Sequence, residues 1–330
     1  MFWLVMMLKT GNRIGGKWVV VVACALWILS AAGVVQAAPG SFPLAFQARK
    51  GDHTITLLGT IHAGQSTMYP MPRTLYDALQ ASDALVFEID IDPDALSGVE
   101  SLLGEKSRLP DETNLFEVLS SDMFFKLERK LQPYGIHLIE RLQFEPWFFS
   151  LIINSLPMGS GQLDVKQGVE THLRNRREVE GKPVLSLETL EEQVAYFRME
   201  SIEDQTEVLR FFLQSLEAQE ESMDALLDAW KTGDVDHFEQ ELTKLSSADV
   251  PDRIQAFWAG LIHSRNRTML NRMLALSDEY ARLYVAVGTL HLVGPDGVVS
   301  GLETSGYRVE RIIYKDMEGP SADPLKGGAE

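Results

Sequence analysis

Two stretches at opposite ends of the chain decide the fold: residues 54–62 read TITLLGTIH, and residues 283–291 read LYVAVGTLH. Each apolar run leads directly into Gly-x-x-His, and such a run predicts a buried strand. If the two strands are neighbours in one sheet, their carboxyl ends place His62 and His291 at the same edge, where open α/β sheets bind ligands. We expect each glycine to let the backbone turn sharply as its strand ends. Because imidazole commonly binds divalent transition metals, this edge is a candidate metal site; a structural role for each histidine is the alternative.

The segments around these two runs predict an α/β fold with a central mixed β-sheet formed by the N- and C-terminal parts and a largely helical middle. Apolar residues recur at three- and four-residue spacing through the middle of the chain, which is typical of helices that pack on a core. Further strands are expected at 42–47, 84–90, 183–187 and 307–313. Helices are expected at 72–81, 121–132, 146–155, 169–180, 190–198, 203–230, 252–276 and 296–304, and one more is expected to begin at Pro93.

The first 37 residues are typical of a signal peptide. Three basic residues precede an apolar run at 18–35, and no acidic residue occurs before Asp52. Val-Gln-Ala at 35–37 fits the small-x-small pattern that signal peptidase cleaves. The apolar run is also just long enough to span a bilayer, so retention as a membrane anchor is the alternative. We therefore expect an exported protein, periplasmic or extracellular, with any membrane association through this segment.

Composition excludes several classes of function. The net charge of -17 argues against a nucleic-acid partner, because phosphate binding needs clustered lysine and arginine. The single cysteine, Cys24, lies in the predicted signal peptide, which excludes a cysteine nucleophile, a thiolate metal site and disulfides in the mature chain. No His-Glu-x-x-His helix, Gly-x-Ser-x-Gly elbow, phosphate-binding loop or dinucleotide fingerprint occurs. Residues 38–315 are expected to form one domain, followed by a disordered tail at 316–330.

Two glutamates directly follow predicted strands. Glu88 lies at the end of an otherwise apolar run, and Glu188 follows the strand expected at 183–187. Because a lone buried carboxylate is costly, Glu88 is expected to be a metal ligand or general base, with a solvated strand end as the alternative. Glu188 is either a general base or simply a favourable acid beside the start of a helix.

Three further side chains are candidates for the same site. Residues 168–172 read GVETH; in an extended chain Glu170 and His172 would point to opposite sides, so only one is expected to face the site. Glu170 is a candidate metal ligand and His172 a candidate substrate-binding residue. Arg265 lies on a predicted long helix, where its guanidinium could hold a substrate carboxylate or a site acid bidentately; surface exposure is the alternative.

Short motifs stand in a fixed order along the chain: LGTIH at 58–62, YPMP at 69–72, VFE at 86–88, GVETHL at 168–173, GKPV at 181–184, LET at 187–189, EQ at 192–193, RN at 265–266, VGTLHLVG at 287–294 and GYRV at 306–309. In this order they resemble the TraB/GumN family, which also contains PrgY and the animal TIKI proteins. The resemblance covers nearly all of the chain after residue 37. Each motif is short, and their joint order makes the match specific.

The resemblance implies an α/β fold and, from the TIKI branch, a metal-dependent protease that uses both Gly-x-x-His motifs. Carried over by position, it implies that His62 and His291 are metal ligands and that Glu88 is the accompanying acid. Glu170 stands where the family commonly has aspartate, and this departure puts its role as a ligand in doubt.

The leading hypothesis is an exported metal-dependent hydrolase, a peptidase that acts on peptides or proteins of the cell envelope. One divalent ion (zinc, manganese or cobalt) would polarise the scissile carbonyl and lower the pKa of its bound water, and Glu88 or Glu188 would take the proton. The alternatives are a PrgY-like protein that binds and sequesters peptides without cleaving them, or an accessory factor in envelope polysaccharide assembly. The expected partner is a peptide or protein substrate.

Overall fold

The computed structural model describes residues 42–90, 102–156 and 163–314. The expected signal peptide, the helix expected at Pro93 and the expected tail at 316–330 lie outside these ranges and stay predictions. Within the described ranges, no helix is long and apolar enough to cross a bilayer.

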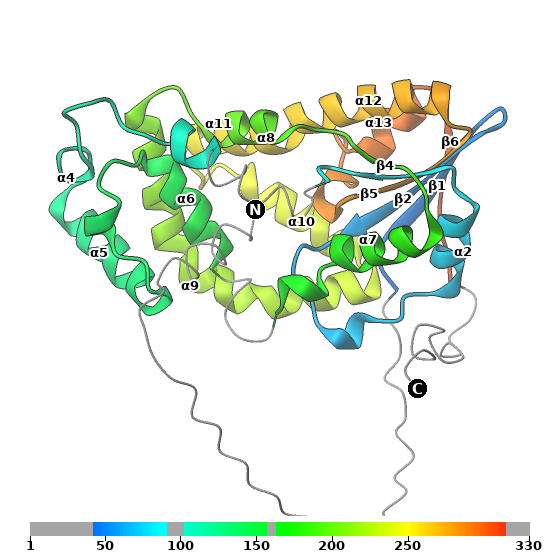
Figure 1. The fold of residues 1–330 in the computed structure, drawn as a ribbon, viewed down its shortest axis with the longest axis horizontal. Helices are drawn as coiled ribbons and strands as arrows, with labels where there is room; N and C mark the ends of the chain where they lie inside the picture. Colours follow the sequence, from blue (N-terminus) through cyan, green and yellow to red (C-terminus); the bar gives the residue numbers. More distant parts are fainter. Residues whose placement is uncertain (1–41, 91–101, 157–162, 315–330) are drawn as a thin grey trace, which may run out of the picture.

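A six-stranded mixed sheet forms one half of the molecule, with strand order β4-β3-β5-β2-β1-β6 (Figure 1). Strands β4, β3, β5 and β2 run parallel, whereas β1 is antiparallel to β2 and β6 is antiparallel to β1. The bounds are β1 Ala45–Lys50, β2 His53–Thr60, β3 Ala84–Phe87, β4 Val184–Ser186, β5 Arg282–Gly288 and β6 Arg308–Arg311. The predicted α/β fold, with a sheet drawn mainly from the two ends of the chain, is confirmed.

The two strands that precede Gly-x-x-His are neighbours. β2 and β5 pair in parallel, with Thr60 opposite Gly288, so both strands end at the same edge of the sheet. The interior residues of both strands are buried, as expected for parallel strands that are covered on both faces. The two strands are therefore neighbours in one sheet, as the metal-site hypothesis requires, and His62 and His291 follow adjacent strand ends.

The glycines of these motifs permit close packing rather than a turn. Gly288 has φ -52°, and Gly59 lies within β2 without a positive φ, so other residues could adopt both backbones. A Cβ on Gly59 would lie 2.8 Å from Thr289 Oγ1, and one on Gly288 would lie 3.0 Å from Glu88 Oε1. The expectation that glycine frees the backbone to turn is wrong; the missing side chains instead let neighbouring groups approach.

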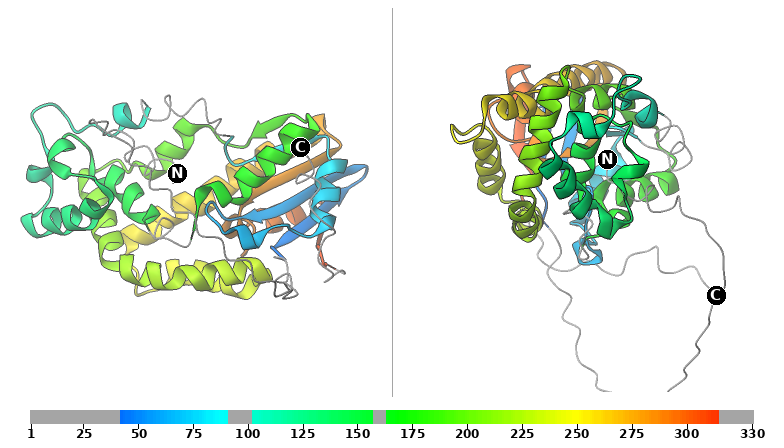
Figure 2. Two further views of the ribbon diagram at one scale, coloured as in Figure 1. Left: turned by 60° about the horizontal axis from the view of Figure 1, so that its bottom comes forward. Right: turned by 90° about the vertical axis from the view of Figure 1, so that its left-hand side faces the viewer.

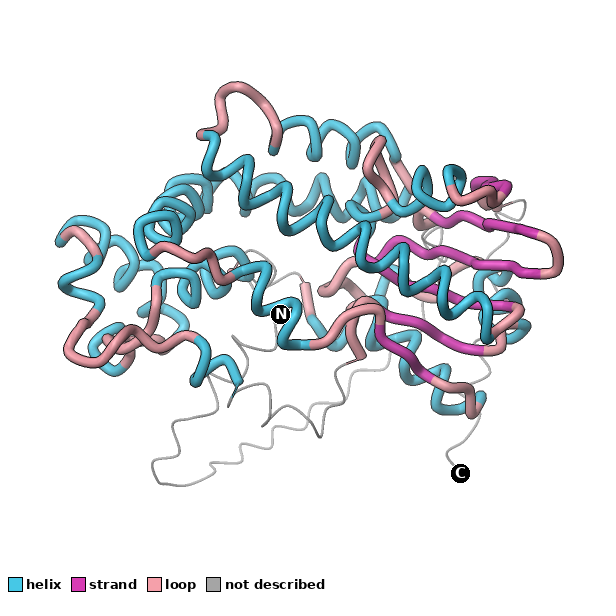
Figure 3. Tube along the Cα trace, turned by 90° about the horizontal axis from the view of Figure 1, so that it is seen from above, coloured by secondary structure: helices cyan, strands magenta, loops and turns pink. Residues whose placement is uncertain are grey.

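Helices cover the sheet and form a separate helical half (Figures 2 and 3). Ser120, Thr189, Ser201 and Asp234 cap helix starts by accepting a hydrogen bond from a backbone N–H of the first turn. The α-helices are α2 Arg73–Ala81, α4 Leu115–Val118, α5 Ser121–Leu131, α6 Pro146–Ser155, α7 Val169–Glu180, α8 Leu190–Phe197, α9 Ile202–Thr232, α10 Val235–Leu245, α11 Asp252–Ala259, α12 Arg265–Glu279 and α13 Val298–Thr304. The 3-10 turns are η1 Ser66–Met68, η3 Gln132–Tyr134, η4 Leu138–Glu140, η6 Val165–Gln167 and η8 Thr289–His291.

Two long helical segments join two hydrophobic cores, one around the sheet and one within the helical half. Helix α9 contributes Leu209 to the helical core and Trp230 to the sheet core. The segment formed by α11, a π-helical turn η7 (Gly260–Ser264) and α12 contributes Phe257 to the helical core and Met269 to the sheet core. π turns within α-helices are frequent at functional sites, and this one directly precedes Arg265.

Candidate active site

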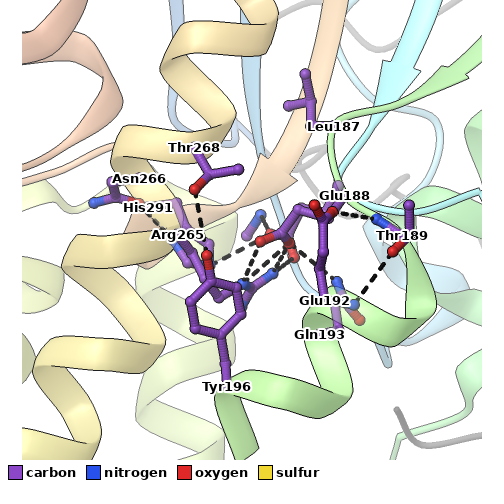
Figure 4. Close-up of polar contacts among 12 residues, drawn as sticks. Leu187, Glu188, Thr189, Glu192, Gln193, Tyr196, Arg265, Asn266, Thr268 and His291 are labelled. Atoms are coloured by element: carbon purple, nitrogen blue, oxygen red, sulfur yellow. Dashed lines mark hydrogen bonds and ion pairs between the residues drawn. The ribbon is translucent and has the colours of Figure 1, made fainter.

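A buried ion triad joins three segments that are distant in sequence: Glu88 after β3, Glu188 after β4 and Arg265 at the start of α12. Figure 4 shows Glu188 and Arg265 side by side. Arg265 Nη2 donates to Glu88 Oε2 at 2.7 Å and to Glu188 Oε2 at 2.6 Å, and Arg265 Nε lies 3.0 Å from both oxygens of Glu188. The three side chains are at most 9% exposed. Two carboxylates share one guanidinium, so this buried group carries a net negative charge.

Glu88 is held in its ionised form. Burial raises the pKa of Glu88, but Arg265, His291, His62 and the backbone N–H of Gly288 together hold that pKa well below its usual range. The Gly288 N–H donates to Glu88 Oε1 at 2.6 Å. A carboxylate with so low a pKa is a weak proton acceptor near neutral pH, so its chemistry suits ion binding better than general base catalysis.

His291 lies in the 3-10 turn that follows β5 and is only 5% exposed. Its Nδ1 is 2.6 Å from Asn266 Oδ1, and its Nε2 is 3.6 Å from Glu88 Oε1. Burial lowers the pKa of His291 to about 4, although the Glu88 carboxylate opposes this shift. The ring is therefore neutral at pH 7, and one of its two nitrogens carries a free lone pair.

His62 follows β2 at the same sheet edge, and its side chain is 49% exposed. His62 Nδ1 lies 2.9 Å from Glu170 Oε1, and Thr60 Oγ1 donates to the same oxygen at 2.5 Å. The Glu170 carboxylate raises the pKa of His62 above its usual value. A carboxylate that accepts from one ring nitrogen orients the ring, an arrangement common around metal-binding histidines.

Gly168 allows the helix that carries Glu170 to reach the end of β2. A Cβ on Gly168 would lie 2.2 Å from the carbonyl oxygen of His62, a distance that atoms cannot adopt. The next residue, Val169, donates its backbone N–H to Ile61 O at 3.1 Å. The glycine of the GVETH motif is thus required by the contact between α7 and the histidine segment.

His172 makes different contacts from Glu170. Its ring stacks on Tyr69 with centroids 4.0 Å apart, and its Nε2 lies 2.9 Å from the hydroxyl of Tyr76. Residues two apart on a helix point to different sides, so the segment separates Glu170 from His172 although it is helical rather than extended. A substrate-binding role for His172 stays a prediction.

The structure brings Glu88, Glu188, Arg265 and His291 into one buried network, and places the His62–Glu170 pair at the same sheet edge. The guanidinium of Arg265 binds the site acids Glu88 and Glu188; binding a substrate carboxylate was the other role proposed for it. The side chain is buried rather than exposed on the surface. The sequence reasoning missed Asn266 as a partner of His291; its position beside Arg265 was the available signal.

Helix α8, which follows Glu188, is tied to α12 by a second ion pair. Arg272 binds both oxygens of Glu192 at 2.7 and 2.6 Å and also donates to the carbonyl of Leu187. Glu192 in turn caps the helix by accepting from the backbone N–H of Thr189 at 2.9 Å. These contacts fix the segment that carries Glu188.

The Glu192–Arg272 pair is expected to contribute stability that is lost in acid. The hydrogen bond from Arg272 lowers the pKa of Glu192 to about 2 from 4.5, so its contribution is complete above about pH 4.5 and disappears as the pH falls through 2. In urea denaturation at pH 6, Glu192→Gln should lower the free energy of unfolding by less than about 1 kcal/mol, because both side chains are over one third exposed. The difference from wild type should shrink as the pH falls through 2 and vanish below it. Glu191→Gln, an exposed change on the same helix, serves as the control, and equal effects of the two variants would contradict this prediction.

The metal ion implied by the sequence requires a group of suitable donor side chains. In residues 42–90, 102–156 and 163–314, no three or more histidine, cysteine, aspartate or glutamate side chains gather closely enough to hold a metal by themselves. The donor chemistry nevertheless fits a divalent cation: the neutral imidazole of His291 lies 3.6 Å from the ionised carboxylate of Glu88, which belongs to the net negative triad. His291 and Glu88 are the best-placed pair of donors, and His62 lies at the same edge.

These strands, motifs and side chains define the class of protein. The chain belongs to the TraB/PrgY/gumN family, whose family model matches residues 44–311. The resemblance noted from the motifs is thereby confirmed.

Among curated proteins, the chain is similar to the uncharacterized protein YbaP of Escherichia coli (strain K12), with 24% identity over 74% of this chain and 86% of YbaP. It is 25% identical to Metalloprotease TIKI2 of Xenopus tropicalis over 77% of this chain and 57% of that protein. Identity to Metalloprotease TIKI1 of Danio rerio is 24% over 83% of this chain and 65% of that protein. The chain thus spans less than two thirds of either TIKI protein. No solved structure gives a significant match.

Proposed function

We propose that this protein is an exported metal-dependent hydrolase, and specifically a peptidase. The observation that carries the proposal is the distance of 3.6 Å between His291 Nε2 and Glu88 Oε1 in a buried, net negative network. With its proton on Nδ1, His291 would offer the Nε2 lone pair, and a divalent cation could bind between this nitrogen and the Glu88 carboxylate. The names of the two TIKI relatives, both metalloproteases, support the choice of reaction, and the N-terminal sequence supports export.

In this proposal His291 and Glu88 hold the ion, and Glu170 orients the ring of His62. His62 completes the ligand set by moving closer to this pair when the ion binds, because no three such side chains gather closely enough in the described residues. The ion would polarise the scissile carbonyl and activate water. Arg265 keeps Glu88 ionised and in place through a hydrogen bond of 2.7 Å.

Glu188 is the proposed proton acceptor, but hydrogen bonds already occupy both of its carboxylate oxygens. Both of its carboxylate oxygens lie within 3.0 Å of Arg265 Nε, and Gln193 Nε2 lies 3.3 Å from Glu188 Oε2. Accepting a proton therefore requires the ion pair with Arg265 to loosen as substrate binds.

The test uses the protein loaded in turn with zinc, manganese and cobalt, and a diverse peptide library. We expect cleavage by the wild type and a loss of about 100-fold or more in kcat/KM for His62→Ala and for His291→Ala, since each removes a group that acts on the reacting atoms. His137→Ala, which changes a half-exposed histidine of the helical half, should leave activity unchanged.

Absence of cleavage by every metal-loaded sample, or full activity in either site variant, would overturn the peptidase proposal. Peptide binding that survives a chelator without cleavage would instead support the sequestering alternative.

A further inference from the structure

Asn266 links His291 to a backbone carbonyl. It is 3% exposed and lies in the first turn of α12, next to Arg265 (Figure 4). Its Oδ1 lies 2.6 Å from His291 Nδ1, and its Nδ2 donates to the carbonyl oxygen of Asp296 at 2.8 Å. Three polar groups therefore form a continuous hydrogen-bonded chain that ends on the backbone.

The backbone end of this chain sets the direction of every hydrogen bond in it. A carbonyl oxygen only accepts, so the amide group of Asn266 must turn its NH₂ toward Asp296. The reversed amide would place two acceptor oxygens 2.8 Å apart. The amide oxygen is therefore left for His291, and because that oxygen also only accepts, Nδ1 of the neutral ring must carry the proton.

We propose that Asn266 is a positioning residue that holds His291 in the Nδ1–H tautomer, so that Nε2 presents its lone pair toward Glu88. The Asp296 carbonyl imposes this tautomer through the Asn266 amide. The inference about ion binding rests on the proposed function, whereas the tautomer itself does not.

Without Asn266, two influences would move the proton to the other nitrogen. A free neutral imidazole prefers the proton on Nε2, and the Glu88 carboxylate, 3.6 Å from Nε2, would accept a hydrogen bond from it. The shorter contact with Asn266, at 2.6 Å, opposes both influences. A proton on Nε2 would pair His291 with Glu88 and remove the lone pair that a cation needs.

A purely structural role is the competing explanation, because the bond to Asp296 also ties α12 to the loop after His291. Asn266→Leu removes both donor and acceptor at similar volume, whereas Asn266→Asp keeps an oxygen that accepts from Nδ1 but loses the donor to the Asp296 carbonyl. Asn271→Leu makes the same chemical change as Asn266→Leu at an exposed position of α12 and serves as the matched control.

The decisive measurement is long-range ¹H–¹⁵N NMR of the metal-free, full-length chain labelled at histidine, with His291 assigned by comparison with His291→Gln. We expect a proton on Nδ1 and none on Nε2 in the wild type and in Asn271→Leu, and a proton kept on Nδ1 in Asn266→Asp. Asn266→Leu should shift the proton to Nε2. A wild-type ring protonated on Nε2, or an unchanged tautomer in a folded Asn266→Leu, would overturn the proposal.

Zinc affinity, measured by competition with a chelator, provides the second readout. Asn266→Leu is expected to bind zinc about 10- to 100-fold more weakly than the wild type, and Asn271→Leu equally well, because partners that fix a ligand ring tune its affinity. If the wild type binds no zinc, the proposed function fails in its zinc form, but the NMR result still decides the role of Asn266. Should Asn266→Leu fail to fold, the wild-type tautomer and Asn266→Asp keep the inference open to refutation.

Discussion

Replacement of Arg265 by methionine is expected to lower the free energy of unfolding by about 3–5 kcal/mol, the range measured when one partner of a buried ion pair is removed. The change leaves the carboxylates of Glu88 and Glu188, which are 7% and 2% exposed, without their shared guanidinium. Their desolvation is then uncompensated, and their like charges repel at short range. Denaturation in urea at pH 7 would measure the loss.

Arg267→Met is the matched control, because Arg267 is exposed on the same helix and should change stability by no more than about 0.5 kcal/mol. Arg265→Lys keeps the charge but not the planar fork that reaches both acids, so an intermediate loss is expected. A loss for Arg265→Met as small as that of the control would show that the triad is not a structural element.

The second large effect is expected for Trp230→Ala, which should lower the free energy of unfolding by about 3–5 kcal/mol. Trp230 is 1% exposed in the last turn of α9, where it packs in the sheet core. Its Nε1 donates to the carbonyl oxygen of Gly59 at 2.9 Å, which fixes the end of β2 just before His62. Chemical denaturation would measure the stability, and the NMR signals of the His62 ring would report whether it loses its contact with Glu170.

Trp230→Phe separates packing from the hydrogen bond. It keeps most of the apolar volume but removes the donor to the Gly59 carbonyl. The free energy of unfolding is therefore expected to fall by about 1–3 kcal/mol, less than for Trp230→Ala. A loss below about 1 kcal/mol for Trp230→Ala would contradict the view that α9 anchors this strand end.

Much of the fold could be predicted because its signals are local. Helix α9, expected at 203–230, spans Ile202–Thr232, since a regular apolar spacing and a capping serine mark it within a few residues. Helix α10 was missed although its signals were present: Gly233 ends α9 in a left-handed conformation, and Asp234 caps the next helix.

The candidate site was only partly predictable, because its contacts join distant segments. Arg265 lies 177 residues from Glu88 and 77 from Glu188, and no local pattern indicates that one guanidinium serves both. The role of Gly168 could not be predicted for the same reason. A side chain at this position would collide with the carbonyl oxygen of His62, which lies close by only in the folded chain.

The sequence alone predicted the strands, most helices and the position of the two Gly-x-x-His motifs at strand ends, because these features depend on interactions within a few residues. Only the tertiary structure decided which carboxylates Arg265 binds, that the glycines permit contact rather than a turn, and that Asn266 stands between His291 and the Asp296 carbonyl. Side-chain partners and the position of a ring proton depend on which distant backbone segments meet, and that is determined by the packing of the whole chain.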